Sequence, residues 1–366
     1  MKEFENKIYR RLLAPVLACL VLALAGCSQD ATEAEAPSSP TGGTYLTIVT
    51  RGINTITPTE YEDYVGKLRF LIFDSEGKNI LNLSLTNDGI PDIPDHTGDA
   101  STDASSVVLD EQNIGQISSG VYTFYCIANE DGYSNTADEL LSVALGVDKD
   151  ITEEYLDGMQ VKFTENDIRK PTGTDKYMLM STKQDFLIRA GETNSITIVL
   201  DRALAKAQLV IQSTDKITDN ISVSLPKDKI PASYSLIKQE TIESSKTFLD
   251  AGSILLEGNG EIFDDKALPD NDNVSNEYIS QVVYLPERAA TSISDALYYS
   301  IIIGKRTYDN QAPIAYKKSD QTMEYNIIRN YAYTTICTYD PAQPATLSLT
   351  YTVQPWGTGG GDHTFN

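Results

Sequence analysis

The strongest constraint on the fold of this chain is the period of its apolar residues after position 44. Side chains of a β-strand point alternately to opposite faces of a sheet, so a half-buried strand shows a period of two. The clearest example lies at 346–353, where Leu347, Leu349, Tyr351 and Val353 alternate with Ser and Thr residues. Similar runs recur, and we expect strands at 45–50, 67–73, 120–128, 195–200, 207–211, 279–285, 297–304, 325–339 and 346–353.

The order of these runs predicts the fold class. Loops rich in Asp, Gly and Pro separate them, without the regular alternation of strands and helices that a parallel α/β sheet requires. Only 136–145 has apolar residues at helical spacing, which predicts one short helix. We therefore expect an all-β chain of two antiparallel β-sandwich domains in tandem, with the helix in the first. The chain of 366 residues is long enough for two cores, and the predicted domains are 52–204 and 205–366.

The N-terminal segment has the order of an export signal. Four basic residues up to Arg11 precede an apolar run at 12–25, which is too short to span a bilayer. The run ends in Leu-Ala-Gly-Cys27, which resembles the lipobox of bacterial lipoproteins, where a signal peptidase cuts before a lipidated cysteine. The predicted signal peptide is 1–26, and an ordinary secretory signal is the alternative. Residues 28–43 have no large apolar side chain, which predicts a flexible tether.

Charge and composition exclude several classes of function. The 29 basic residues stand against 52 acidic ones, a net charge of −23, whereas nucleic-acid-binding proteins present a basic surface. The two histidines, His96 and His363, fit no zinc site and no nucleophile triad, and the acidic clusters at 92–103 and 264–272 lack the spacing of a calcium loop. We therefore predict that the chain is not an enzyme, binds no metal or cofactor, and binds no nucleic acid. A hydrolase with a dispersed carboxylate pair is the alternative.

The cysteines give a separate expectation. Removal of Cys19 with the signal and lipidation of Cys27 would leave Cys126 and Cys337. Both stand in strand runs assigned to different domains, which favours two buried thiols over one disulfide.

A strand run that ends in a basic residue stands between the tether and the first predicted domain. Residues 45–50 predict the strand, and Arg51 and Gly52 follow it directly. A trypsin-like protease cutting there would remove the strand. Spacing alone favours the simpler interpretation that this strand begins the sandwich and stays in it, because domains ordinarily begin with a strand. The residues leave both interpretations open.

Several motifs, taken in their order along the chain, resemble the Bacteroidales fimbrillins, the subunits of type V pili. The motifs are LRFLIFD at 68–74, VYTFYCIANE at 121–130, YMLMS at 177–181, LDRALAK at 200–206, IRNYAY at 328–333 and TYTVQPW at 350–356. The resemblance runs over nearly the whole chain, and the order and spacing of the motifs carry it.

The resemblance implies a fold, a location and a maturation route. The fold would be two transthyretin-like β-sandwich domains, and the chain would reach the cell surface as an outer-membrane lipoprotein with its lipid on Cys27. An arginine-specific protease would then cut between Arg51 and Gly52, removing 27–51 with the first strand. Other copies of the chain, or related fimbrial subunits, would fill the vacated groove by donor-strand exchange and build a fimbria that supports adhesion. The implied donor residues are Leu347, Leu349, Tyr351, Val353, Trp356 and Phe365.

Two alternatives to a shaft subunit remain. The glycine-rich stretch 357–361 is poor in the apolar side chains that would fill a groove, which leaves a tip or anchor subunit open. A surface lipoprotein that binds glycans is the alternative from another class. The tether and the 21 tyrosines motivate it, because glycan sites expose stacked aromatic rings.

Overall fold

The structure is a computed structural model that describes residues 46–50, 62, 65–86, 105–109, 117–169, 177–189, 194, 197–242, 247–258, 260–262, 274–318 and 320–355. At 46–50, 105–109, 197 and 355 it describes the backbone only. The chain divides into two compact units, Met1–Gly42 and Gly43–Asn366, and all described residues lie in the second. No helix within the described ranges is long and apolar enough to cross a membrane. The predicted signal peptide and tether lie outside these ranges.

The first large sheet has five strands in the order β3-β2-β5-β7-β9. The strands are β2 (Lys67–Phe73), β3 (Asn79–Thr86), β5 (Gly120–Ala128), β7 (Met180–Ile188) and β9 (Asp201–Arg202). All neighbours pair antiparallel. Phe70 and Phe124 are buried on one face of this sheet, and Leu71 and Tyr125 are buried on the other. The strands predicted at 67–73 and 120–128 are confirmed with the same bounds.

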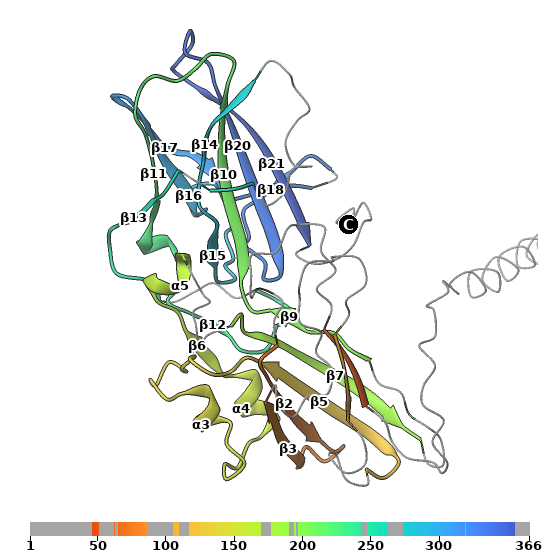
Figure 1. Cartoon of the computed structure of the whole chain (residues 1–366). Coiled ribbons are helices and arrows are strands. Elements are labelled where there is room, and N and C mark those ends of the chain that lie inside the picture. Colours follow the sequence, from red (N-terminus) through yellow and green to blue (C-terminus); the bar gives the residue numbers. More distant parts are fainter. Residues whose placement is uncertain are drawn as a thin grey trace, which may run out of the picture. The chain divides into compact units, whose positions relative to one another are not determined.

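Short helices stand between β5 and β7 and cover part of this sheet (Figure 1). They are α3 (Leu141–Ala144), α4 (Glu153–Asp157) and α5 (Glu165–Arg169). The Tyr125 hydroxyl of β5 donates to Glu153 Oε2 at 3.2 Å and to Asp157 Oδ1 at 3.0 Å, which fixes α4 on the sheet. The helix predicted at 136–145 is shorter than expected. Asn135 Oδ1 accepts two backbone N–H groups and Asp138 has φ 61°, so a turn replaces the first helical residues.

The strands after residue 204 form two more sheets, β14-β10-β20-β21 with β15 also on β10, and β13-β11-β16-β17. The strands are β10 (Ala205–Ser213), β11 (Ile221–Pro226), β13 (Ser253–Leu256), β14 (Ser275–Ile279), β15 (Val283–Leu285), β16 (Tyr298–Ile303), β17 (Arg306–Pro313), β20 (Tyr331–Tyr339) and β21 (Leu347–Pro355). β10 is buried along its whole length and runs beside β20 (Figure 1). The all-β prediction is confirmed. The pairing of β10 with β20 is parallel, however, in a fold predicted to be antiparallel.

Two predicted strands have the wrong bounds, and each error has a local cause. The run at 279–285 divides into β14 and β15 because Ser280 between them bonds to β10. Its hydroxyl oxygen accepts the Leu209 N–H at 3.0 Å, and its carbonyl accepts Gln208 Nε2 at 2.9 Å. The run at 325–339 becomes β20 only from Tyr331, after Asn330 with φ 60°. A left-handed residue ends an extended run.

The predicted boundary between residues 204 and 205 falls between β9 and β10, which belong to different sheets. Ala203 and Leu204 join them and are buried. Because the residues on both sides of this boundary belong to one compact unit, the division into tandem domains stays a prediction.

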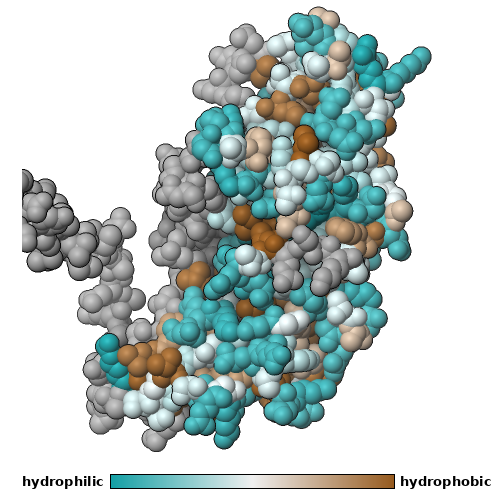
Figure 2. All heavy atoms as spheres, turned by 180° about the vertical axis from the view of Figure 1, so that it is seen from behind, coloured by the Kyte–Doolittle hydropathy of each residue, from teal (hydrophilic) through white to brown (hydrophobic). Residues whose placement is uncertain are grey.

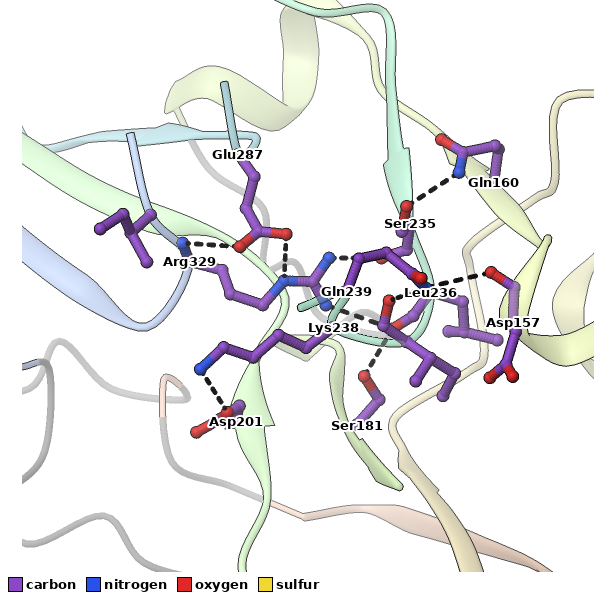
Figure 3. Close-up of polar contacts among 12 residues, drawn as sticks. Asp157, Gln160, Ser181, Asp201, Ser235, Leu236, Lys238, Gln239, Glu287 and Arg329 are labelled. Atoms are coloured by element: carbon purple, nitrogen blue, oxygen red, sulfur yellow. Dashed lines mark hydrogen bonds and ion pairs between the residues drawn. The ribbon is translucent and has the colours of Figure 1, made fainter. Parts of the chain in front are cut away.

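A polar cluster ties the residues before and after this boundary together (Figure 3). β6 (Gln160–Lys162) pairs antiparallel with β12 (Ser233–Ser235). The buried Arg329 then joins the end of β12 to Glu287, with its Nε 2.7 Å from Glu287 Oε2. Its terminal nitrogens donate to the carbonyls of Ser235 at 2.6 Å and Leu236 at 3.3 Å. We call Arg329, Glu287, Ser235 and Leu236 the Arg329 cluster. The carbonyl of Leu236 also accepts the Ser181 hydroxyl of β7, so the cluster reaches the first sheet.

Replacing Arg329 with alanine is expected to lower the free energy of unfolding by about 3–5 kcal/mol, because removing one partner of a buried ion pair strands the other. Denaturant titration followed by circular dichroism measures the loss. The matched control is Arg306→Ala at the exposed start of β17, which should change stability by less than about 0.5 kcal/mol. Equal losses in the two variants would contradict the role given to the cluster.

Candidate functional site

The strand predicted at 45–50 forms, and it is the central strand of a small sheet. The order is β4-β1-β8, with β1 at Leu46–Thr50, β4 at Ser105–Leu109 and β8 at Thr197–Ile198. β1 pairs antiparallel with β4 over its whole length, from Leu46 opposite Leu109 to Thr50 opposite Ser105. Its other edge pairs parallel with β8. β1 therefore holds a strand on each side.

The central position of β1 determines what its removal would do. The backbone N–H and C=O groups of β4 and β8 that face β1 would lose their partners, and a strand edge in that state accepts a new strand. Ile198 of β8 is fully buried, so the position occupied by β1 borders the apolar core. The arrangement is suited to strand replacement.

The predicted donor strand also has a definite place. β21 pairs antiparallel with β20 of the same chain over nine residues, from Tyr331 opposite Pro355 to Tyr339 opposite Leu347. It is the last strand in the order of this sheet. The predicted alternation holds along β21. Its residues Leu347, Leu349 and Val353 pack partly against the core, and burial raises the pKa of Tyr351.

Several predicted site residues lie outside the described residues. They are Cys27, Arg51, Gly52, Trp356 and Phe365, and both histidines join them. Their roles stay predictions. β1 ends one residue before Arg51, and β21 ends one residue before Trp356. The described strands therefore lead directly to the predicted cleavage site and into the predicted tail.

Sequence reasoning found β1 and β21 but missed their partners in the sheets. β4 has the short sequence SSVVL, which gives too few residues to show a period. β8 is shorter than the strand predicted at 195–200. The pairing of β21 with β20 is a contact between strands in space, and no local pattern announces it.

The described residues offer these strands little side-chain chemistry. Within the described ranges, no group of three or more His, Cys, Asp or Glu side chains could hold a metal ion. Cys126 and Cys337 are free thiols, as predicted, and burial raises the pKa of both. A buried thiol with a raised pKa is a poor nucleophile. The chemistry available at β1 and β21 is the pairing of backbone groups.

Solved structures with the same fold extend over most of the chain. One is the tip fimbrial protein Mfa3 of Porphyromonas gingivalis with a C-terminal truncation, at 14% identity and a TM-score of 0.56. The match covers 86% of this chain and 100% of that one. Another is a candidate cell adhesion protein of Parabacteroides distasonis, at 12% identity and a TM-score of 0.50, covering 87% of this chain and 99% of that one. No protein-family model matches the sequence, and comparison with curated proteins gives no match. The chain thus has the fold of a fimbrial β-sandwich protein.

A charge placed on the inner side of β21 tests whether this strand is held by the core. Leu349→Asp is expected to lower the free energy of unfolding by about 1–3 kcal/mol, because Leu349 packs partly against the core. The neighbouring Thr350 is exposed on the other side, and Thr350→Asp should stay within about 0.5 kcal/mol of the original chain. Thermal or urea unfolding compares the two variants. If both lose the same stability, β21 is not seated as described.

Proposed function

We propose that this chain is a subunit of a cell-surface fimbria that supports adhesion and polymerises by donor-strand exchange. One observation carries the proposal. β1 is paired on both edges and ends directly before Arg51, so one cut would free a strand whose place another strand can take. The fold shared with a tip fimbrial protein supports the same function.

In this proposal maturation begins at the outer membrane. The precursor is held there by lipid on Cys27, and an arginine-specific protease cuts between Arg51 and Gly52. Residues 27–51 then leave with β1 and the lipid, and the subunit passes from the membrane into the fimbria. The vacated position beside β4 and β8 becomes the acceptor groove for a strand of another subunit.

The proposed donor is the C-terminal segment that begins with β21 and continues to Trp356 and Phe365. The sequence of β21 is LSLTYTVQP, which contains no charged residue, so its insertion beside a core buries no charge. In this structure β21 is bonded to β20, and donation requires it to leave. Backbone hydrogen bonds lost to β20 are remade in the groove of the next subunit, so the exchange is close to balanced in hydrogen bonds.

The surface gives the glycan-binding alternative little support. The face shown in Figure 2 is largely hydrophilic, with small and separate hydrophobic patches. Among the described residues the exposed large aromatic side chains are Tyr155 and Phe248, from different parts of the chain. A glycan site would need stacked aromatic rings on one face. A fimbrial subunit is therefore the better-supported function.

The position of the subunit in a fimbria depends on which exchange it performs. A chain that both accepts and donates a strand stands within the shaft, whereas a chain that does only one stands at an end. A lock on β21 separates these two possibilities.

The lock is a disulfide between β20 and β21 in the double variant Thr338→Cys, Ser348→Cys, whose Cα atoms are direct partners in the ladder. After a limiting dose of trypsin, the oxidised protein beginning at Ser28 is expected to stay monomeric, because β21 cannot leave. The reduced protein is expected to form rods that electron microscopy detects. The native thiols Cys126 and Cys337 are buried and do not compete for the bond.

The variant Arg51→Ala is the control, and it should form no rods in either redox state. Rods that form equally fast from the oxidised, cleaved protein would show that β21 stays in its own chain and is not the donor. Cleaved, reduced protein that remains monomeric under all conditions would contradict a shaft subunit.

A further inference from the structure

Glu62 is a buried carboxylate with partners on three strands. Its Oε2 lies 2.9 Å from Lys206 Nζ of β10, and its Oε1 accepts the Tyr284 hydroxyl of β15 at 2.5 Å. Its backbone carbonyl accepts Arg202 Nε of β9 at 3.3 Å. The side chains of Glu62 and Lys206 are each 1% exposed. We call Glu62, Arg202, Lys206 and Tyr284 the Glu62 anchor.

The anchor fixes the chain shortly after the proposed cleavage site. Glu62 comes eleven residues after Arg51, and residues 52–66 contain no lysine or arginine. The next basic residue is Lys67, which begins β2. A protease that cuts after basic residues therefore meets Lys67 as its second site.

A second set of contacts lies just beyond the anchor. Val65 is buried, and the N–H of Gly66 donates to Asn129 Oδ1 at 2.8 Å. The Lys67 ammonium pairs with Glu130 at 3.0 Å and with Asp131 at 2.9 Å. Once β1 has left, the chain end could peel toward these contacts. The Glu62 anchor stands between that end and Lys67.

We propose that the Glu62 anchor limits processing to Arg51, by holding the new N-terminal segment against β9, β10 and β15 so that Lys67 and β2 stay closed to the protease. The inference rests on the proposed function and deepens it. Proteases cut segments that open locally, and a segment tied by a buried ion pair opens only when that pair breaks. The anchor thus separates the strand that is removed from the strand that must stay.

Release of the peptide Gly52–Lys67 measures the anchor directly. Protein beginning at Ser28 is treated with a limiting dose of trypsin, and mass spectrometry follows that peptide against cleavage at Arg51. In Glu62→Gln the isosteric side chain loses the ion pair with Lys206, and release is expected to rise about tenfold or more. The milder Tyr284→Phe removes one hydrogen bond and is expected to give a smaller rise in a chain that still folds.

The matched control is Glu287→Gln, which breaks the buried ion pair of the Arg329 cluster and leaves the Glu62 anchor intact. Its release of Gly52–Lys67 should equal that of the original chain. Release that is unchanged in Glu62→Gln, or raised equally in Glu287→Gln, would overturn the inference.

Hydrogen exchange of the uncleaved protein separates this inference from the proposed function. The amides of residues 65–67 are expected to exchange about tenfold faster in Glu62→Gln and at the original rate in Glu287→Gln. If Arg51 resists every protease dose while this difference is observed, the proposed function fails and the anchor stands. If Arg51 is cut and neither exchange nor peptide release changes in Glu62→Gln, the anchor fails alone.

Discussion

The satisfaction of backbone groups along strand edges is the constraint on which this structure depends. β10 shows it in the interior, where it is buried at every residue and bonded to β20 on one edge and to β14 and β15 on the other. β1 obeys the same constraint in a smaller sheet, with β4 and β8 as partners. The two strands differ in their surroundings along the chain. β10 lies within the core, whereas β1 ends at the edge of a candidate cleavage site, so a strand with two partners is also the strand most easily separated from the chain.

Buried basic residues change the meaning of the net charge. Within the described residues Arg69, Arg202, Lys206, Arg288 and Arg329 are buried, against the acidic Glu62, Glu130 and Asp167. The core thus takes more positive than negative charge out of the composition, and the surface is more acidic than the sum of −23 suggests. Like-charged surfaces repel and resist lateral association. Joining such subunits end to end therefore depends on apolar and backbone contacts, which β1 and β21 supply.

Local pattern was sufficient for the strands whose side chains the core selects on both faces. The runs at 67–73 and 120–128 are strands with the predicted bounds, because consecutive residues such as Phe70 and Leu71 are buried on opposite faces. Local pattern failed where a distant strand or a special backbone conformation decides. Ser280 interrupts a predicted strand by bonding to β10, and Asn330 does so through a positive φ. β7 was missed over most of its length because Lys183 and Asp185 stand on its exposed side and dilute the apolar period.

For the candidate site, sequence identified both strands but not their state. The pairing of β21 with β20, and the buried partners of Glu62, join residues far apart along the chain, and only the fold brings them together. A buried carboxylate in a polar stretch such as Thr59-Glu60-Tyr61-Glu62-Asp63 has no local signature that separates it from its neighbours.

The antiparallel direction of β20 and β21 has a mechanical consequence. Pro355, at the C-terminal end of β21, lies opposite Tyr331, the first residue of β20. Tension applied beyond Pro355 and across the ladder loads the hydrogen bonds at this end first and breaks them one after another. Tension along the strands would instead load the whole ladder in shear. β21 therefore unzips from its C-terminal end toward Leu347 under a small force, yet resists a pull along its own axis with all its bonds at once.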